Sequence, residues 1–415
     1  MELKKYKLGE ILDVTRGASL SGEFYATEGK YIRLTCGNFD YQNNCFKENK
    51  SKDNLYYIGD FKPEFLMEEG DIITPLTEQA IGLLGSTAII LESGKYIQSQ
   101  DVAKIICKEE LLDKDFAFYL ISSTLVKQQL SVAAQQTKIR HTSPDKIRDC
   151  TVWIPELTEQ KRIGKLLRSL DRKIELNRAI NQNLEAMAKQ LYDYWFVQFD
   201  FPDENGRPYK SSGGEMVWNE KLKRKIPNEW ENCKLKDFIN LFDSKRIPLS
   251  SKDREERKGN YPYYGATGIM DYVNEYIFDG DYILLAEDGS TSDSKGFPIV
   301  QYIWGKNWVN NHAHIILPKN EQYLMFTYQM LRSIPAKQIE TGSIQKKISQ
   351  ENLCEYNMVL PNSILIEKYE SIISPLWEKR KLCIEEINAL IKQRDELLPL
   401  LMNGQASVNS DLSAH

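Results

Sequence analysis

The residues TGSIQKKISQ at positions 341–350 bring several hydrogen-bond donors together in a short stretch. Hydroxyl, amide and ammonium groups all donate hydrogen bonds, and a glycine lets the backbone approach a neighbouring surface closely. The residues concerned are Gly342, Ser343, Gln345, Lys346 and Lys347. The pattern indicates a polar turn that offers donors, and the plainer alternative is a solvated turn leading into a strand.

No catalytic motif accompanies these donors. The sequence lacks a G-x-x-x-x-G-K-[ST] phosphate loop, a G-x-G-x-x-G loop and the [DN]-P-P-[FY] motif with which amino-methyltransferases hold a target base. His312 and His314 would need a third ligand to hold a metal, and none stands at a suitable spacing. His141 is isolated, and the acidic loop 287–294 is expected to be solvated rather than to bind a cation. We therefore predict no catalytic residue, no metal and no cofactor on this chain.

The composition of the 415 residues is that of a globular protein, with 41% hydrophobic and 27% charged residues. The N-terminus lacks the apolar core of a signal peptide, and no run of about 18 apolar residues would span a membrane. The seven cysteines are scattered without a C-x-x-C pair, which predicts reduced thiols in a cytoplasmic protein. Because the net charge is −5, any binding to DNA would need local basic patches or a basic partner.

The donor-rich stretch occurs in two copies, which reveals an internal repeat. When Pro155 is aligned with Pro361, Arg140 falls opposite Lys346. Other segments match at slightly different offsets, which indicates insertions in surface loops; they are 68–76 with 278–286, 100–106 with 311–317, and 6–14 with 233–241. Both halves are typical of short strands bounded by turns. We predict an α+β fold of two tandem β-rich domains, each followed by a long helix, with pseudo-two-fold symmetry.

Each copy ends in a run of roughly 40 residues with apolar positions every three or four residues. A stripe of this length is explained if the two helices pack on each other, and the alternative is one separate amphipathic helix in each domain. Asn177 and Asn181 would then set the register of the pair at some cost in stability. The predicted seam consists of Ile163, Leu167, Leu170, Ile174, Asn177, Asn181, Leu184, Leu191, Ile373, Leu376, Ile387, Leu390 and Leu397.

The ends of the helices and the connections between domains have their own signals. We expect Thr158 to cap the first helix and Asn362 or Ser363 to cap the second. Pro375 should kink the second helix or delay its start. The predicted organisation is a first β-rich domain at 1–155, a helix at 156–198, a linker rich in Pro, Gly and charge at 199–230, a second β-rich domain at 231–361, a helix at 362–404 and a flexible tail at 405–415.

Several motifs resemble the specificity subunit of Type I restriction–modification systems. They are LYDYWFVQFDFPDENGRPYKSSGGEM at 191–216, YYGATGIMDYVNEYIFDGDYILLAEDGS at 263–290 and TGSIQKKIS at 341–349. With the duplicated architecture, the resemblance covers nearly the whole chain. It implies two target-recognition domains, each reading half of an interrupted DNA sequence. It also implies that the long helices form an antiparallel coiled coil.

The resemblance further implies the partners of the chain. The helices would set the gap between the half-sites and dock two methyltransferase subunits, which use S-adenosylmethionine to methylate adenine at N6. Motor–nuclease subunits that use ATP and Mg would join them to cut unmodified DNA, and this chain itself would be non-catalytic. Two rival interpretations are a stand-alone DNA-binding regulator with two reading heads and a coiled-coil scaffold protein. A neighbouring gene with the [DN]-P-P-[FY] motif would favour the specificity subunit over both.

Under this resemblance the donor-rich stretch becomes a DNA-facing loop, because lysine contacts phosphate and glutamine pairs bidentately with adenine. Loops at equivalent places in the two copies add further candidates, and a plain surface loop is the alternative for each. Gln345→Ala should relax recognition at one base position, whereas Lys346→Ala should weaken binding broadly and lower its salt dependence. The predicted DNA-binding residues are Arg16, Thr77, Gln79, Gln136, Lys138, Arg140, His141, Lys245, Arg246, Ser290, Thr291, Ser343, Gln345, Lys346 and Lys347.

Overall fold

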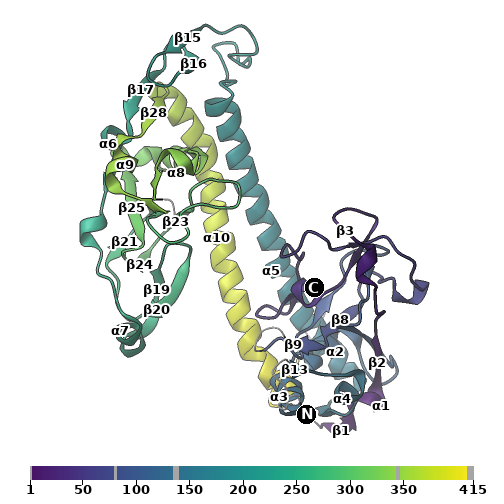
Figure 1. Cartoon of the computed structure of the whole chain (residues 1–415). Coiled ribbons are helices and arrows are strands. Elements are labelled where there is room, and N and C mark those ends of the chain that lie inside the picture. Colours follow the sequence, from purple (N-terminus) through teal and green to yellow (C-terminus); the bar gives the residue numbers. More distant parts are fainter. Residues whose placement is uncertain (1, 79–81, 134–139, 343–345, 409–415) are drawn as a thin grey trace. The chain divides into compact units, whose positions relative to one another are not determined.

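The computed structural model describes residues 2–78, 82–133, 140–342 and 346–408 (Figure 1). The chain divides into two compact units: unit 1 comprises Met1–Asn177 and Glu385–His415, and unit 2 comprises Arg178–Ile384. Both units combine small sheets with helices, which confirms the predicted α+β class. No helix in the described part of the chain has the length and apolar character that a membrane span requires.

Each unit is built on a four-stranded antiparallel sheet, and the strand order is the same in both. The order is β10-β8-β12-β2 in unit 1 and β23-β22-β25-β18 in unit 2. This correspondence confirms the internal repeat that the sequence predicts. The strands are β2 (Leu12–Arg16), β8 (Ile72–Pro75), β10 (Ala88–Ile89) and β12 (Val102–Cys107) in unit 1, and β18 (Ile239–Leu241), β22 (Tyr282–Ala286), β23 (Val300–Ile303) and β25 (Ala313–Pro318) in unit 2.

A second four-stranded sheet in each unit contains one parallel pair, β4–β11 in unit 1 and β19–β24 in unit 2. Unit 2 has the longer strands, because β19 and β20 form an extended hairpin. The strands are β3 (Tyr25–Ala26), β4 (Tyr31–Arg33), β7 (Tyr56–Tyr57) and β11 (Tyr96–Ile97) in unit 1, and β19 (Lys258–Tyr264), β20 (Ile269–Val273), β21 (Phe278–Asp279) and β24 (Lys306–Val309) in unit 2.

Small two-stranded pairs and short helices complete each repeat. The pairs β1–β14 and β17–β28 are equivalent in the two units, since each joins the first strand of a copy to the strand before its long helix. These elements are β1 (Lys4–Lys7), α1 (Leu8–Ile11), β5 (Phe39–Asp40), β6 (Cys45–Phe46), α3 (Thr124–Ala133), α4 (Pro144–Arg148), β14 (Thr151–Ile154), β17 (Glu231–Lys234), α6 (Leu235–Phe238), α7 (Ser251–Glu256), α9 (Gln350–Glu355) and β28 (Asn357–Leu360).

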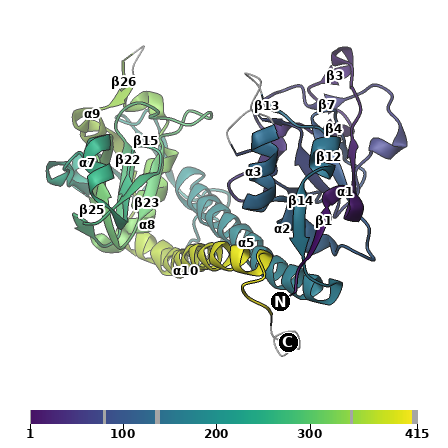
Figure 2. The same ribbon diagram turned by 90° about the horizontal axis from the view of Figure 1, so that it is seen from below.

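The hydrophobic core of each unit joins its central sheet to the long helices. In unit 1, one cluster contains Ile105 of the sheet, Phe116 of α2 (Lys114–Ile121), Ile163 of the first long helix and Leu401 of the second. In unit 2, α8 (Leu324–Ser333) lies between the sheet and the second long helix (Figure 2). Burial of this apolar surface is the main favourable term in folding, so the helices and sheets of each unit stabilise one another.

The long helices are α5 (Leu157–Tyr192), which continues as a π-helical turn (Asp193–Val197), and α10 (Ser363–Met402). In unit 1, Asn177 donates to Glu386 at 2.8 Å, and Arg394 donates to Asp171 at 2.8 Å. In unit 2, the rings of Trp195 and Tyr369 lie 6.0 Å apart. In unit 1, Asp171 contacts Arg394 and the later Asn177 contacts the earlier Glu386. The two helices therefore run antiparallel (Figure 1). Every predicted seam residue is buried or half-buried.

Two of the predicted helix signals need comment. The prediction that Thr158 caps the first helix is wrong, because α5 begins at Leu157. Asn362 does cap the second helix, since its side-chain oxygen accepts the N–H of Leu365 at 2.9 Å. The predicted delay at Pro375 is also wrong, because α10 begins at Ser363 and its helical assignment continues through the proline.

The segment 199–230, predicted as a linker, carries ordered structure within unit 2. It contains the hairpin β15 (Met216–Asn219) and β16 (Arg224–Pro227). The ring of Phe201 stacks on Tyr209 at 4.7 Å and on Trp230 at 5.2 Å. The predicted domain boundaries remain a prediction, since the two compact units instead divide within the long helices.

Candidate nucleic-acid interface

The donor-rich stretch of unit 2 lies where several strand ends meet. Strand β26 (Glu340–Thr341) pairs with β27 (Lys347–Ile348) and closes the base of the loop between them. On the other side of β27, the backbones of Lys347 and Asp288 form an isolated antiparallel β-bridge, and the N–H of Ile348 donates to the carbonyl of Glu287 at 2.8 Å. The loop is therefore held against the end of β22, where the sequence places a second group of candidate residues.

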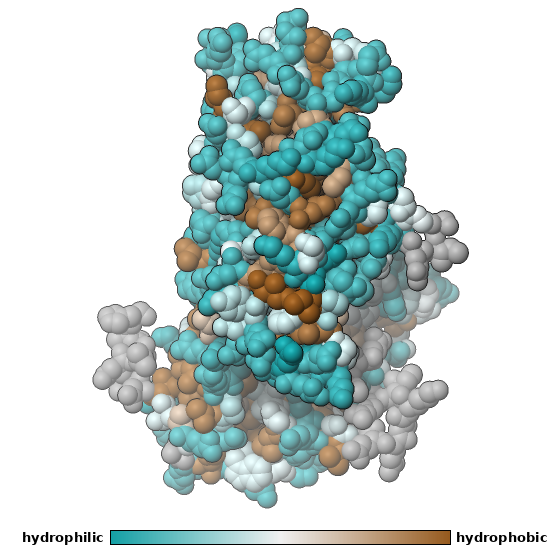
Figure 3. Space-filling model, turned by 90° about the vertical axis from the view of Figure 1, so that its left-hand side faces the viewer, coloured by the Kyte–Doolittle hydropathy of each residue, from teal (hydrophilic) through white to brown (hydrophobic). Residues whose placement is uncertain are grey.

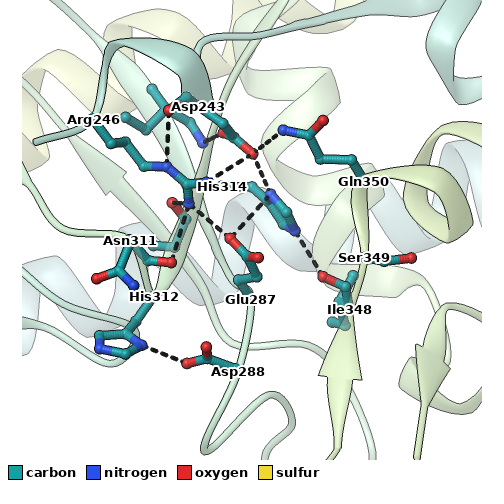
Figure 4. Close-up of polar contacts among 12 residues, drawn as sticks. Asp243, Arg246, Glu287, Asp288, Asn311, His312, His314, Ile348, Ser349 and Gln350 are labelled. Carbon is teal, nitrogen blue, oxygen red and sulfur yellow. Dashed lines mark hydrogen bonds and ion pairs between the residues drawn. The ribbon is translucent and has the colours of Figure 1, made fainter. Parts of the chain in front are cut away.

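A fully buried histidine fixes this strand from beneath (Figure 4). Nδ1 of His314 lies 2.5 Å from a carboxylate oxygen of Asp243, and Nε2 lies 2.8 Å from the carbonyl oxygen of Ile348. Both neighbours offer oxygen atoms, so the ring links a buried carboxylate to the backbone of this strand. Burial alone would raise the pKa of Asp243, but hydrogen bonds from His314 and from Gln350 hold that pKa below its usual value.

An arginine and a lysine balance a second carboxylate beside the histidine. Arg246 lies 2.7 Å from one oxygen of Glu287, and Lys347 lies 3.1 Å from the other. Burial acts to raise the pKa of Glu287, but these two cations lower it overall. Arg246 also donates to the carbonyls of Asn311 and Ala313, so its guanidinium is engaged inside the protein. Lys347 keeps about half of its side chain exposed, which leaves it able to meet a phosphate.

The side chains of Asp243, Glu287 and His314 bring ligand-type atoms within 4.8 Å of one another. A metal would need lone pairs from these groups, yet both nitrogens of His314 already contact protein oxygens and the carboxylates already accept from protein donors. The arrangement is better explained as a charge-balanced ion cluster. His312 is no partner of His314 in metal binding, because its Nδ1 faces Asp288 at 2.6 Å.

A second ion pair holds the other strand of the loop. Glu340 accepts a hydrogen bond from Thr291 at 2.7 Å and pairs with Lys346 at 3.0 Å. Burial favours a raised pKa for Glu340, but these donors lower it. Thr291 is 1% exposed and faces inward, whereas Ser290 beside it is exposed. Lys346 is half exposed, so it shares with Lys347 the position of a cation at the protein surface.

Unit 1 places its candidate residues at the equivalent strand ends. Strand β9 (Thr77–Glu78) pairs with β13 (Arg140–His141). The equivalent contact in unit 2 is the β-bridge between the backbones of Asp288 and Lys347. The hydroxyl of Thr77 lies 3.2 Å from Nδ1 of His141, which is exposed. In both copies, the residues after one central strand thus pair with the stretch that precedes the long helix.

Among the described residues of unit 1, the buried ion cluster itself has no counterpart. Arg16 lies four residues after the start of β2, and Asp243 lies four residues after the start of β18, so the two positions are equivalent. Arg16 pairs with Ala103 of β12. Arg16 is exposed, and its Nε donates to the carbonyl of Gln100 at 2.9 Å. Unit 1 therefore has an exposed cation at the position where unit 2 has a buried anion.

The other predicted residues are placed as follows. Lys245 is exposed, with its ammonium 5.0 Å from the ring of Phe242. The sequence did not single out Asp243, Glu287, Glu340 or Gln350, which hold the loop in place, because nothing in their spacing indicates that they face one another. Only the backbone of Arg140 is described, and five candidates lie outside the described residues, namely Gln79, Gln136, Lys138, Ser343 and Gln345.

Comparison with known proteins identifies the family. A model of the Type I restriction modification DNA specificity domain matches residues 1–186 and 227–386. The chain belongs to this family of Type I restriction–modification DNA specificity subunits. The match falls in two segments, one for each copy of the internal repeat, so family and fold agree.

Members of the Type I specificity family resemble the chain over different lengths. The Type I restriction enzyme MjaIX specificity subunit of Methanocaldococcus jannaschii is 23% identical over 330 residues, which cover 75% of this chain and 73% of that protein. A putative Type I specificity subunit of Haemophilus influenzae is 34% identical over 142 residues, 34% of this chain and 35% of that protein.

A solved structure supports the fold of this Type I specificity subunit over its whole length. The crystal structure of the S subunit of a Type I restriction–modification system from M. genitalium matches with a TM-score of 0.60 at 18% identity. The match covers 97% of this chain and 96% of that one. The tandem arrangement of globular domains and long helices is therefore shared with a known family structure.

Proposed function

We propose that this specificity subunit reads a bipartite, gapped DNA target, one half-site with each repeat. The observation that carries the proposal is the duplicated sheet, in which the residues after one central strand pair, in both copies, with the stretch that precedes the long helix. In unit 2 that stretch carries Lys346 and Lys347 at the surface, where cations are suited to DNA phosphates. DNA-reading residues are often carried by loops that a rigid scaffold positions.

The antiparallel helices α5 and α10 are proposed to set the gap between the half-sites and to dock two adenine-N6 methyltransferase subunits. Motor–nuclease subunits would join the same complex for restriction. The chain itself is proposed to be non-catalytic and to carry no cofactor. S-adenosylmethionine would be bound by the methyltransferase subunits, and ATP with Mg by the motor subunits. The acidic balance of this chain supports such an assembly, because basic partners would supply further phosphate contacts.

The test is a base-modification map of the host genome, with and without this gene, in cells that express the methyltransferase. Loss of N6-methyladenine at one gapped motif on deletion, and its return on complementation, would support the proposal and reveal the target. An unchanged map would contradict it and favour a stand-alone regulator or a scaffold. A strain that carries this gene but lacks the methyltransferase is the control, since it should show no methylation at the motif.

A further inference from the structure

The hairpin between β19 and β20 of unit 2 presents two apolar side chains at its tip. Ile269 is 47% exposed and Met270 is 55% exposed. On the face shown in Figure 3, apolar residues stand in separate patches among hydrophilic ones, and single exposed apolar residues need no explanation. This tip differs because two adjacent apolar residues are exposed on a backbone that the protein holds in place.

Two buried or half-buried amides hold the tip in one conformation. Gln301 donates to the carbonyls of Gly265 and Ala266, each at 3.0 Å. Asn310 donates to the sulfur of Met270 at 3.2 Å. A Cβ atom at position 265 would overlap the Met270 side chain, so the glycine is what allows that side chain to lie across the tip. A side chain held in this way loses little conformational entropy when it binds a partner.

The tip is continuous with the candidate nucleic-acid interface. The side-chain oxygen of Asn310 accepts the N–H of His312 at 2.8 Å, and the ring of His312 pairs with Asp288. Figure 4 shows the contact between His312 and Asp288, and the backbone of Asp288 forms an isolated β-bridge with Lys347. These contacts link the side chain of Met270 to the strand that carries Lys347.

The charge around the tip is compatible with a polyanion. The nearest acidic residue in the hairpin sequence is Asp271, directly after Met270. Its carboxylate pairs with Lys258 at 2.8 Å and with Arg254 at 3.3 Å, so its charge is compensated. These cations hold the pKa of Asp271 below its usual value through hydrogen bonding. DNA approaching the tip would not meet an unpaired carboxylate there.

We propose that Met270, supported by Ile269, contacts a thymine methyl group in the half-site that unit 2 reads. The proposal rests on the proposed function of the chain. The C5-methyl of thymine is the apolar group that base edges present in the major groove, so it is the chemical partner that a thioether and a branched alkyl group select. Met270 is thus assigned as a specificity-determining residue.

The experiment measures binding of the complete methyltransferase complex to duplexes of the mapped target. Each thymine in turn is replaced by deoxyuridine, which lacks only the methyl group. The wild-type complex should lose affinity about four-fold at one thymine, the factor expected for burial of one methyl group. The Met270→Ala complex should bind thymine and deoxyuridine equally at that position. Gly265→Ala should behave in the same way, because the added Cβ displaces Met270.

The matched control is Ile58→Ala, which changes an isoleucine of unit 1 that is 65% exposed. It should keep the four-fold preference for thymine. Indifference of the wild-type complex to deoxyuridine at every position, or an unchanged preference in Met270→Ala, would overturn the inference while specific binding remains. If the wild-type complex shows no sequence-specific binding, the proposed function fails and the inference with it.

Discussion

His314 shows how a single buried residue can position a candidate DNA-contacting loop. Its ring faces the carboxylate of Asp243 and the carbonyl of Ile348, next to Lys347 in the sequence. A buried charge is tolerated only while its partners remain, so loss of one member leaves the others uncompensated. The strand that carries Lys347 therefore depends on a side chain that is itself inaccessible to DNA.

At the residue scale, His314→Ala is expected to lower the free energy of unfolding by about 1–3 kcal/mol, since it removes a hydrogen-bond partner from the buried Asp243 and from the carbonyl of Ile348. Chemical denaturation would measure the loss. His312→Ala is the matched control, because its side chain is 47% exposed and pairs with a partly exposed Asp288. That change should cost less than about 1 kcal/mol. Equal losses from both substitutions would contradict the role of the buried cluster.

Glu370 predicts a pH dependence of stability. Burial raises its pKa from 4.5 to about 7, although the N–H of Phe326 and the hydroxyl of Ser374 both donate to it. The folded state therefore binds a proton more tightly than the unfolded state. Its contribution to stability is present below about pH 4.5, falls as the pH rises, and is lost above about pH 7, a change of about 3 kcal/mol.

Glu370→Gln should flatten this dependence between pH 5 and 8, and thermal unfolding followed across that range would test it. The glutamine keeps an acceptor for the N–H of Phe326, so the fold should persist. An equal pH dependence of stability in the wild-type protein and in Glu370→Gln would contradict the raised pKa of Glu370.

Sequence patterns located the candidate loops but not the orientation of the residues within them. Arg246 and Thr291 were predicted to contact DNA, yet their polar groups bond to Glu287 and Glu340 inside unit 2. The sequence singled out His314 only as a possible metal ligand together with His312. Its actual partner, Asp243, lies 71 positions away, and no spacing rule connects them.

At the scale of elements, the helix pair combines an apolar seam with specific polar contacts. Within unit 1, Arg394 is 8% exposed and donates to Asp171, which also accepts a hydrogen bond from Tyr119 of α2 at 2.5 Å. These contacts join both long helices to the globular part of unit 1. They also fix the axial register, because a shift of one helix turn would break the bond between Arg394 and Asp171.

Arg394→Ala should therefore destabilise the protein by about 3–5 kcal/mol, as expected when one partner of a buried ion pair is removed. Denaturation of the single and double variants with Asp171→Ala would measure the coupling between them, and additive losses would argue against a direct role. Lys392→Ala is the matched control on the same helix, since its side chain is 77% exposed. That substitution should change stability by less than about 0.5 kcal/mol.

The helices and the repeat were predictable because periodicity is a local property of the sequence. The seam positions and the Asn362 cap follow from spacing alone. The start of α5 was misplaced by the choice of Thr158, since helix ends depend on the preceding chain. The aromatic stack around Phe201 was not foreseen, because segment 199–230 is rich in the residues that commonly form connectors.

For the whole molecule, the net charge of −5 predicts weak binding to non-specific DNA when the chain is alone. Addition of the methyltransferase partners should strengthen the binding and steepen its dependence on salt, because more phosphate contacts release more counterions. Fluorescence anisotropy between about 50 and 200 mM salt would compare the two. A salt slope for the isolated chain equal to that of the complex would show that the partners add no phosphate contacts.

Unit 1 is assembled from both ends of the sequence, whereas unit 2 is one continuous stretch. On the ribosome, the first 177 residues emerge early but must wait for the last segment, which brings Leu401 against Ile163. The unit that is made first is thus the last to be completed, and its apolar helix face stays open while unit 2 is translated. A chain that ended directly after residue 384 would contain all of unit 2 but would leave unit 1 with an incomplete core.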